Sequence, residues 1–187
     1  MAINLQKGQR ISLEKSMTHA LVGLGWDTNR YDGGADFDLD ASVFLLGEND
    51  KLLRDEDFVF YNNLSGRDGA VVHMGDNLTG GSDGDDEQIF VDLAKLPAEY
   101  SKVIFVVNIY EAKARRQDFG MIQNAFIRLV NSDTNQELCR YNLSENYNGM
   151  TSMIFGEMYR HNGEWKFSAI GQATADDGLG SLIRRYN

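Results

Sequence analysis

The feature that most limits how this chain can fold is a series of short apolar runs, four to ten residues long, spread along its length. The runs are rich in β-branched and aromatic residues, and clusters of Gly, Asn, Asp and Ser separate them, which is typical of strands. The expected strands are 19–25, 37–46, 58–61, 88–93, 103–110, 125–130, 137–143, 152–159 and 165–170. Nine strands in one chain of 187 residues predict an all-β fold, a β-sandwich of two mainly antiparallel sheets with a few short helices.

One connection between strands can be predicted from turn chemistry alone. Asn162-Gly163 separates MYRH from EWKF, and Asn-Gly suits the two positive φ angles of a type I′ hairpin turn. Helix is expected only after Glu111 and around 179–186, with a turn near 92–100. The chain has a single Pro, and we find no linker or fixed-period repeat, so residues 1–187 are expected to form a single domain.

Negative charge is concentrated in two windows of the sequence. Residues 31–50 hold six acidic side chains and residues 68–92 hold seven, and neither window contains Lys or Arg. The rest of the chain contains the other fifteen of the 28 acidic residues and all 18 Lys and Arg residues, so it is slightly positive. The net charge of −10 therefore comes from the two windows. Carboxylates packed this closely repel one another unless a positive charge lies among them. Since no basic side chain is near in the sequence, a bound cation is the simplest explanation.

The first acid-rich segment reads Asp36-Phe37-Asp38-Leu39-Asp40. In an extended chain Phe37 and Leu39 point into the core, and the three aspartates form a row on the other face. Residues two apart on a strand are about 6.6 Å apart, and calcium–oxygen bonds are about 2.3–2.6 Å, so three aspartates in line cannot share one ion. Either the strand bends, or two or more ions bind.

The second segment, Gly75 to Glu87, is expected to be a loop because its four glycines permit positive φ. Its oxygen donors are Asp76, Asn77, Asp83, Asp85, Asp86 and Glu87. Calcium favours such a set because it takes six to eight hard oxygen ligands in irregular geometry, whereas magnesium requires an octahedron. Zinc is not expected, since the segment has no Cys and one His nearby. Asp27 is a further candidate ligand from a neighbouring strand end, or alternatively a turn-capping residue.

The segment does not follow the EF-hand pattern. Counting from Asp76, Gly81 and Glu87 fall at positions six and twelve, as an EF-hand loop requires. Leu78 and Gly80 fall at positions three and five, where that loop needs side-chain oxygens. The sequence therefore predicts a different kind of calcium site.

Composition excludes several classes of function. Nucleic-acid binding is not expected, because a net charge of −10 and a single adjacent Arg pair do not form a basic patch. The chain has no apolar run long enough to span a membrane and no secretory signal at its start, so a cytoplasmic location is expected. Cys139 cannot form an internal disulfide and is expected to be a small buried residue.

Four blocks of the sequence resemble the TerD family, the tellurium-resistance and general stress proteins: 22–46, 60–87, 109–120 and 156–172. The similarity extends from about Ile3 to Leu182, and its most specific part is GDN-x-TG followed by GDDE after an upstream DFDLD. The resemblance implies a cytoplasmic bacterial β-sandwich that binds calcium. It also implies the ligand set Asp36, Asp38, Asp40, Asp76, Asn77, Asp83, Asp85, Asp86 and Glu87, with Asp27 as an additional member.

We therefore expect a non-enzymatic calcium-binding sensor or scaffold of the bacterial tellurium-resistance and stress-response system, with other proteins of that system as partners. The alternative is a metal-dependent phosphoester hydrolase, because close carboxylates can hold two ions. None of the three His has a Ser or Cys partner at a recognised spacing, so no catalytic residue is assigned. A third interpretation is an interaction protein with a solvated acidic face.

Overall fold

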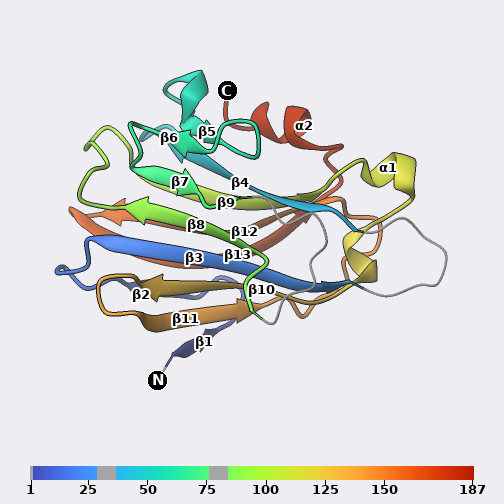
Figure 1. Ribbon diagram of the computed structural model, residues 1–187, viewed down its shortest axis with the longest axis horizontal. Coiled ribbons are helices and arrows are strands. Elements are labelled where there is room, and N and C mark those ends of the chain that lie inside the picture. Colours follow the sequence, from blue (N-terminus) through green and yellow to red (C-terminus); the bar gives the residue numbers. More distant parts are fainter. Residues whose placement is uncertain (1, 29–36, 76–83) are drawn as a thin grey trace.

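Two β-sheets packed face to face make up the chain in the computed structural model, which describes residues 2–28, 37–75 and 84–187 (Figure 1). Sheet A has the strand order β1 (Ile3–Leu5), β11 (Gln136–Asn142), β10 (Ile122–Asn131), β3 (His19–Thr28), β8 (Glu87–Asp92), β7 (Val71–His73) and β6 (Ser65–Gly66). Sheet B has the order β2 (Arg10–Ser12), β13 (Glu164–Thr174), β12 (Ser152–His161), β9 (Lys102–Ile109), β4 (Leu39–Leu46) and β5 (Phe58–Val59). Among the described strands β1 and β11 are parallel, and the other neighbours are antiparallel.

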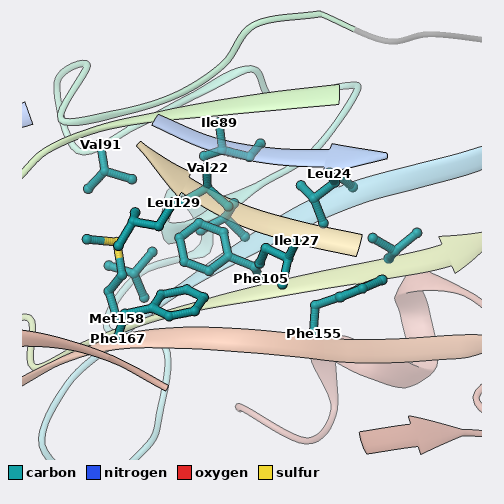
Figure 2. Close-up of a cluster of buried hydrophobic side chains, with 14 of the residues drawn as sticks. Val22, Leu24, Ile89, Val91, Phe105, Ile127, Leu129, Phe155, Met158 and Phe167 are labelled. Carbon is teal, nitrogen blue, oxygen red and sulfur yellow. The ribbon is translucent and has the colours of Figure 1, made fainter. Parts of the chain in front are cut away.

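The main core lies between the two sheets because alternate residues of each strand point inward. Val22 and Leu24 of β3 and Ile89 and Val91 of β8 face Phe105 of β9 and the other inward side chains of sheet B (Figure 2). All five are 1% exposed or less. An inward period of two is therefore present in both sheets.

A second, smaller core covers the outer face of sheet B. Every residue of β4 is buried, and Phe44 packs on this outer face together with Leu182 and Tyr186 near the end of the chain. Leu182 belongs to α2 (Leu179–Ile183). The other short helices are α1 (Ala112–Arg115) and the 3₁₀ turns η1 (Asp55–Asp57) and η2 (Phe119–Met121). In the part of the chain that the structure describes, no helix is long and apolar enough to cross a membrane.

The all-β sandwich expected from the sequence is confirmed. Each of the nine expected strands is present with boundaries shifted by at most four residues, and the helices expected after Glu111 and around 179–186 are present as α1 and α2. The hairpin turn is also confirmed, because Asn162 and Gly163 have φ of 52° and 76° and His161 pairs with Glu164. Cys139 is buried, and burial raises the pKa of its thiol to about 12.

His19, at the start of β3, forms an ion pair that gives the fold a pH dependence. Its Nδ1 lies 2.5 Å from Asp133 Oδ1, and Asp92 Oδ2 is 3.8 Å from Nε2. The hydrogen bond to Asp133 raises the pKa of His19 above 6.5, and the same bond lowers the pKa of Asp133 below 3.8. A raised His pKa stabilises the fold at low pH and stops doing so as pH rises, whereas a lowered Asp pKa stabilises it above about pH 4.

We expect His19→Gln to reduce the free energy of unfolding most between about pH 4 and pH 6.5, where both partners of the pair are charged. The loss should shrink when pH rises through the raised pKa of His19, and also when pH falls through the lowered pKa of Asp133. Urea unfolding of both proteins at about pH 5.5 and pH 8.5 measures this difference. His161→Gln in the exposed hairpin turn is the control. If His19→Gln lowered the free energy of unfolding by the same amount at both pH values, the prediction would be contradicted.

Candidate functional site

The end of β3 and the start of β8 position Asp86, one of the predicted ligands in the described part of the second acid-rich segment. The Asp86 backbone N–H donates to Leu24 O at 2.8 Å, and Asp86 Oδ2 accepts from the Trp26 backbone N–H at 2.8 Å. The carboxylate thus continues the β3–β8 ladder beyond the start of β8 and satisfies a buried backbone donor. Trp26 is 4% exposed and Asp86 is 8% exposed.

Glu87 enters the interior of the sandwich and connects the two sheets. It shares its inward face with Ile89 and Val91, and its Oε2 accepts from the backbone N–H of Ala41 in β4 at 2.7 Å. His73 Nε2 lies 3.3 Å from the same oxygen, and both side chains are 1% exposed. A buried carboxylate needs such donors, since its desolvation is otherwise uncompensated.

A backbone hydrogen bond to His73 indicates which of its ring nitrogens carries the proton. The backbone N–H of Gly75 donates to Nδ1 at 3.2 Å, so Nδ1 is an acceptor. Nε2 is then the protonated nitrogen and is the one that faces Glu87. His73 therefore contacts the start of the second acid-rich segment through a hydrogen bond and lies 3.3 Å from the carboxylate at the end of that segment.

Asp85 points the other way, onto the outer face of sheet A, where Arg128 of β10 binds it. Arg128 Nε and Nη2 donate to Asp85 Oδ1 and Oδ2 at 2.6 and 2.8 Å, and Gln88 Nε2 donates to Oδ2 at 2.9 Å. The side chain of Asp85 is 0% exposed, and the pair raises the pKa of Arg128. Glu137 of β11 binds Arg128 Nη1 at 3.0 Å.

Two glycines of β3 make room for the end of this segment. A Cβ on Gly23 would lie 2.3 Å from the Asp85 carboxylate, which shows that Asp85 crosses β3 directly above Gly23. A Cβ on Gly25 would lie 2.4 Å from the Phe126 ring and 2.8 Å from Gly84 O. The GLG sequence therefore allows the chain to pass across the sheet.

The described aspartates of the first segment lie on the outer face of sheet B. Phe37 and Leu39 are 7% and 1% exposed and belong to the main core, which confirms the expected alternation. Asp38 is half-buried, with Oδ2 3.9 Å from Arg115 Nη1. Asp40 is 4% exposed and lies opposite Asn108 of β9.

Asp27 lies at the other outer face, near the end of β3. Its side chain is exposed, and its Oδ2 accepts from Asn124 Nδ2 at 2.6 Å. Asn124 has φ of 52° where the β3–β10 register shifts, and the resulting bulge directs its amide group toward the end of β3. Within the described residues, the bond from Asn124 holds Asp27, and its carboxylate is open to solvent.

The six described candidates therefore lie in three separate places: the outer face of sheet A, the interior, and the outer face of sheet B. Asp36, Asp76, Asn77 and Asp83 lie outside the described residues. In 2–28, 37–75 and 84–187, no group of three His, Cys, Asp or Glu side chains is placed to hold one metal ion. The calcium ligand set stays a prediction, and at Asp85 a metal would compete with Arg128.

Sequence reasoning missed the cations that face these carboxylates. It found no basic residue near the acids in the sequence, but the fold brings Arg128 to Asp85 across 43 residues and Arg115 toward Asp38. It also missed that His73 faces Glu87. No local sequence pattern predicts these contacts, because each depends on how strands that are distant in the sequence pair. Among the described candidates, Asp27 is exposed, whereas the side chain of Asp38 is 17% exposed.

The structure is a two-sheet sandwich in which Glu87, at the end of the second acid-rich segment, is hydrogen-bonded to Ala41, next to the first. The TerD domain family model matches residues 1–186, and the chain belongs to this family. Within it, the chain groups with tellurium resistance and general stress proteins. General stress protein 16U of Bacillus subtilis is 56% identical, covering 100% of this chain and 97% of its own. Tellurium resistance protein TerD of Serratia marcescens is 54% identical, with the same coverage.

A solved structure agrees with the fold. The crystal structure of a Streptomyces coelicolor A3(2) homologue of the telluride resistance protein TerD matches with a TM-score of 0.68. The match covers 87% of this chain and 93% of that chain, at 20% sequence identity. At this identity the similarity concerns the fold alone.

Proposed function

We propose that this protein is a cytoplasmic calcium-binding protein of the bacterial tellurium-resistance and stress-response system, and that it acts as a non-enzymatic sensor or scaffold. The observation that carries the proposal is the pair of bonds made by adjacent residues: Asp86 to Trp26 N and Glu87 to Ala41 N. These bonds attach the end of the second acid-rich segment to the two strands that flank the first one.

This arrangement brings the charge of both segments to one end of the sandwich. Asp27, Asp38 and Asp86 lie there, and the cation Arg115 lies near Asp38. Carboxylates that lie close together in the sequence repel one another, and a divalent cation would relieve that repulsion. Calcium suits hard oxygen donors in irregular geometry better than magnesium does. The names of the relatives support a role in tellurium resistance and stress response.

Calcium is expected to stabilise the fold by mass action. At a calcium concentration about 100 times Kd, binding to the folded state alone adds about 2.7 kcal/mol, which raises Tm by about 5–10 °C for a domain of this size. Thermal melting in calcium, magnesium and chelator measures the shift, and calorimetric titration gives the ion number. Unchanged melting together with no heat of calcium binding would refute the proposal.

Asp38→Asn should reduce the calcium-induced rise in Tm while leaving the melting temperature in chelator unchanged or higher, because it removes one repelling charge. Asp55→Asn is the matched control, since Asp55 is exposed and lies outside both segments. A turnover screen with phosphomonoesters and phosphodiesters in calcium, magnesium or manganese tests the non-enzymatic role. Turnover that Asp38→Asn abolishes would replace this proposal with the hydrolase alternative.

A further inference from the structure

A row of apolar side chains crosses the outer face of sheet A, the face that points away from sheet B. β7, β8, β3 and β10 contribute to it, and β7, β8 and β3 lie side by side in Figure 1. Val72 pairs with Phe90, and Phe90 pairs with Leu21. Leu21 also pairs with Val130, so four residues in direct register form one line. Alternation places them on the outer face, because their neighbours along each strand belong to the main core. We call these four residues the sheet A stripe.

The stripe is open to solvent along most of its length. Val72, Phe90 and Leu21 are half-buried, and Val130 is buried. Met74, two residues after Val72 and therefore on the same face, is 60% exposed and extends the apolar surface. The face of an antiparallel sheet that meets solvent normally carries polar side chains, so a continuous apolar row there indicates a surface that a partner covers.

The corresponding face of sheet B is covered by the chain itself. Leu182 of α2 and Tyr186 pack there against Phe44 in the second, smaller core. Within 2–28, 37–75 and 84–187, neither hydrophobic cluster contains a residue of the sheet A stripe. The described part of the chain therefore supplies no cover for the stripe that is equivalent to α2.

One flank of the stripe carries excess negative charge. Arg128 lies two residues from Val130 on the same face of β10, and its guanidinium binds both Asp85 and Glu137. The side chain of Glu137 is still 29% exposed. One cation therefore accompanies two carboxylates on this side, which leaves one negative charge in excess.

The opposite flank has the same sign. His19 lies 2.5 Å from Asp133 and 3.8 Å from Asp92. The backbone N–H of Lys95 donates to the Asp92 carboxylate, and the Lys95 ammonium group donates to the backbone oxygen of Asp68. Even with His19 protonated, the three carboxylates of this group outnumber its two cations. The apolar stripe therefore runs between two borders of net negative charge.

These features define what an occupant of the stripe must offer, which is an apolar face bordered by positive charge. A second copy of this chain fits poorly, because it would bring its own net charge of −10 against the same negative borders. A basic amphipathic helix meets both needs. Its apolar residues at i, i+3, i+4 and i+7 form one face, and Lys or Arg can lie along the edges of that face.

We propose that the sheet A stripe binds a basic amphipathic helix of a partner protein. The apolar face of the helix covers Leu21, Phe90 and Met74, and its Lys or Arg side chains lie beside the flanking carboxylates. The flexible thioether of Met74 can adapt to different apolar partners. The inference rests on the scaffold role proposed above and names the class of its partner. No residue of the stripe is a predicted calcium ligand, so binding is expected in chelator as well as in calcium.

The test is an NMR titration of the ¹⁵N-labelled protein in chelator with a synthetic peptide of about 18 residues, made of leucine and lysine with leucine on one helical face. We expect saturable shifts of the backbone amide signals of Leu21, Val72 and Phe90. Phe90→Thr should weaken binding at least about 10-fold, and Met74→Thr about 3-fold, measured calorimetrically. Met74→Thr changes an exposed side chain and so tests the stripe without a risk to folding. Leu53→Thr, at an exposed apolar position outside the stripe, should bind as the wild type does.

Two further peptides test the chemistry of the occupant. The first has glutamate in place of every lysine, and the second keeps the composition but distributes leucine around the whole helix. Both should bind at least about 10-fold more weakly than the original peptide, because one lacks the charge and the other lacks the apolar face. Binding of the original peptide should also weaken when salt rises from about 50 to 500 mM, since salt screens the flanking carboxylates.

Three results would overturn the proposal. The first is a wild-type protein whose stripe signals do not move with the lysine peptide in chelator or in calcium, an outcome that needs no variant to fold. The second is equally tight binding of the glutamate peptide. The third is sedimentation that finds the wild type dimeric and Phe90→Thr monomeric, because the stripe would then join two copies of this chain. Absence of calcium binding would refute the proposed calcium role and leave the titration in chelator unaffected.

Discussion

Replacing Arg128 with Met is expected to lower the free energy of unfolding by about 3–5 kcal/mol, because it leaves a buried carboxylate without its partner. The side chain of Asp85 is 0% exposed, and Arg128 binds both of its carboxylate oxygens. Gln88 would remain as a neutral donor at 2.9 Å. Urea unfolding in chelator measures the change without a contribution from bound metal.

Two comparisons make the Arg128 result specific. Lys7→Met removes the exposed Lys7–Glu145 pair, whose side chains are 47% and 49% exposed, and should cost no more than about 1 kcal/mol. The double variant Arg128→Met with Asp85→Asn should recover part of the lost free energy of unfolding, because the second substitution removes the carboxylate charge that Arg128 no longer balances. A loss of less than about 1 kcal/mol for Arg128→Met would show that the pair is not important for stability.

Gly25→Ala is expected to destabilise the fold by about 1–3 kcal/mol through overpacking. The added Cβ would lie 2.4 Å from the Phe126 ring and 2.8 Å from the backbone oxygen of Gly84. Phe126 is 7% exposed and has the Arg140 guanidinium 3.5 Å above its ring centre, so it has little freedom to move away. Shifting Gly84 would pull on Asp85 and Asp86. Chemical unfolding should therefore show a lower midpoint for this variant.

The matched control is Gly180→Ala in α2. A Cβ at Gly180 meets nothing within 4 Å, and alanine favours helix over glycine by about 1 kcal/mol, so this variant should be neutral or more stable. If the described contact of Gly25 holds the second acid-rich segment in place, Gly25→Ala should also weaken calcium binding, whereas Gly180→Ala should not. Equal stability of the two variants would contradict the close approach at Gly25.

The parts of the fold that could be predicted from the sequence depend on local chemistry. Asn162-Gly163 specifies its turn because both residues accept positive φ, and the long apolar runs specify the strands that form the cores. Strands β1, β2, β6 and β7 were not predicted. Each has three residues or fewer, which is too short for a period of two to be visible, and each exists because a longer neighbour supplies its hydrogen bonds.

The candidate site shows the limit of the same reasoning. Alternation along a strand correctly placed Phe37 and Leu39 in the core, so the outward position of Asp38 and Asp40 followed. It could not show that Glu87 would enter the interior between the sheets and Asp85 would lie on the far side of sheet A. Those positions depend on which strands pair, and pairing is a property of the whole fold.

The pairing of the first two strands has a consequence for how the protein is made. β1 pairs with β11, and β2 pairs with β13, so residues near position 3 and position 12 find their partners near positions 139 and 166. On the ribosome these early segments have no partner until most of the chain has been translated. Such long-range pairing slows folding, and the edges of the unpaired strands stay exposed until their partners have been synthesised. A chain whose synthesis stops before β11 therefore presents two unfinished sheets at once, which makes truncated products targets for chaperones and proteases.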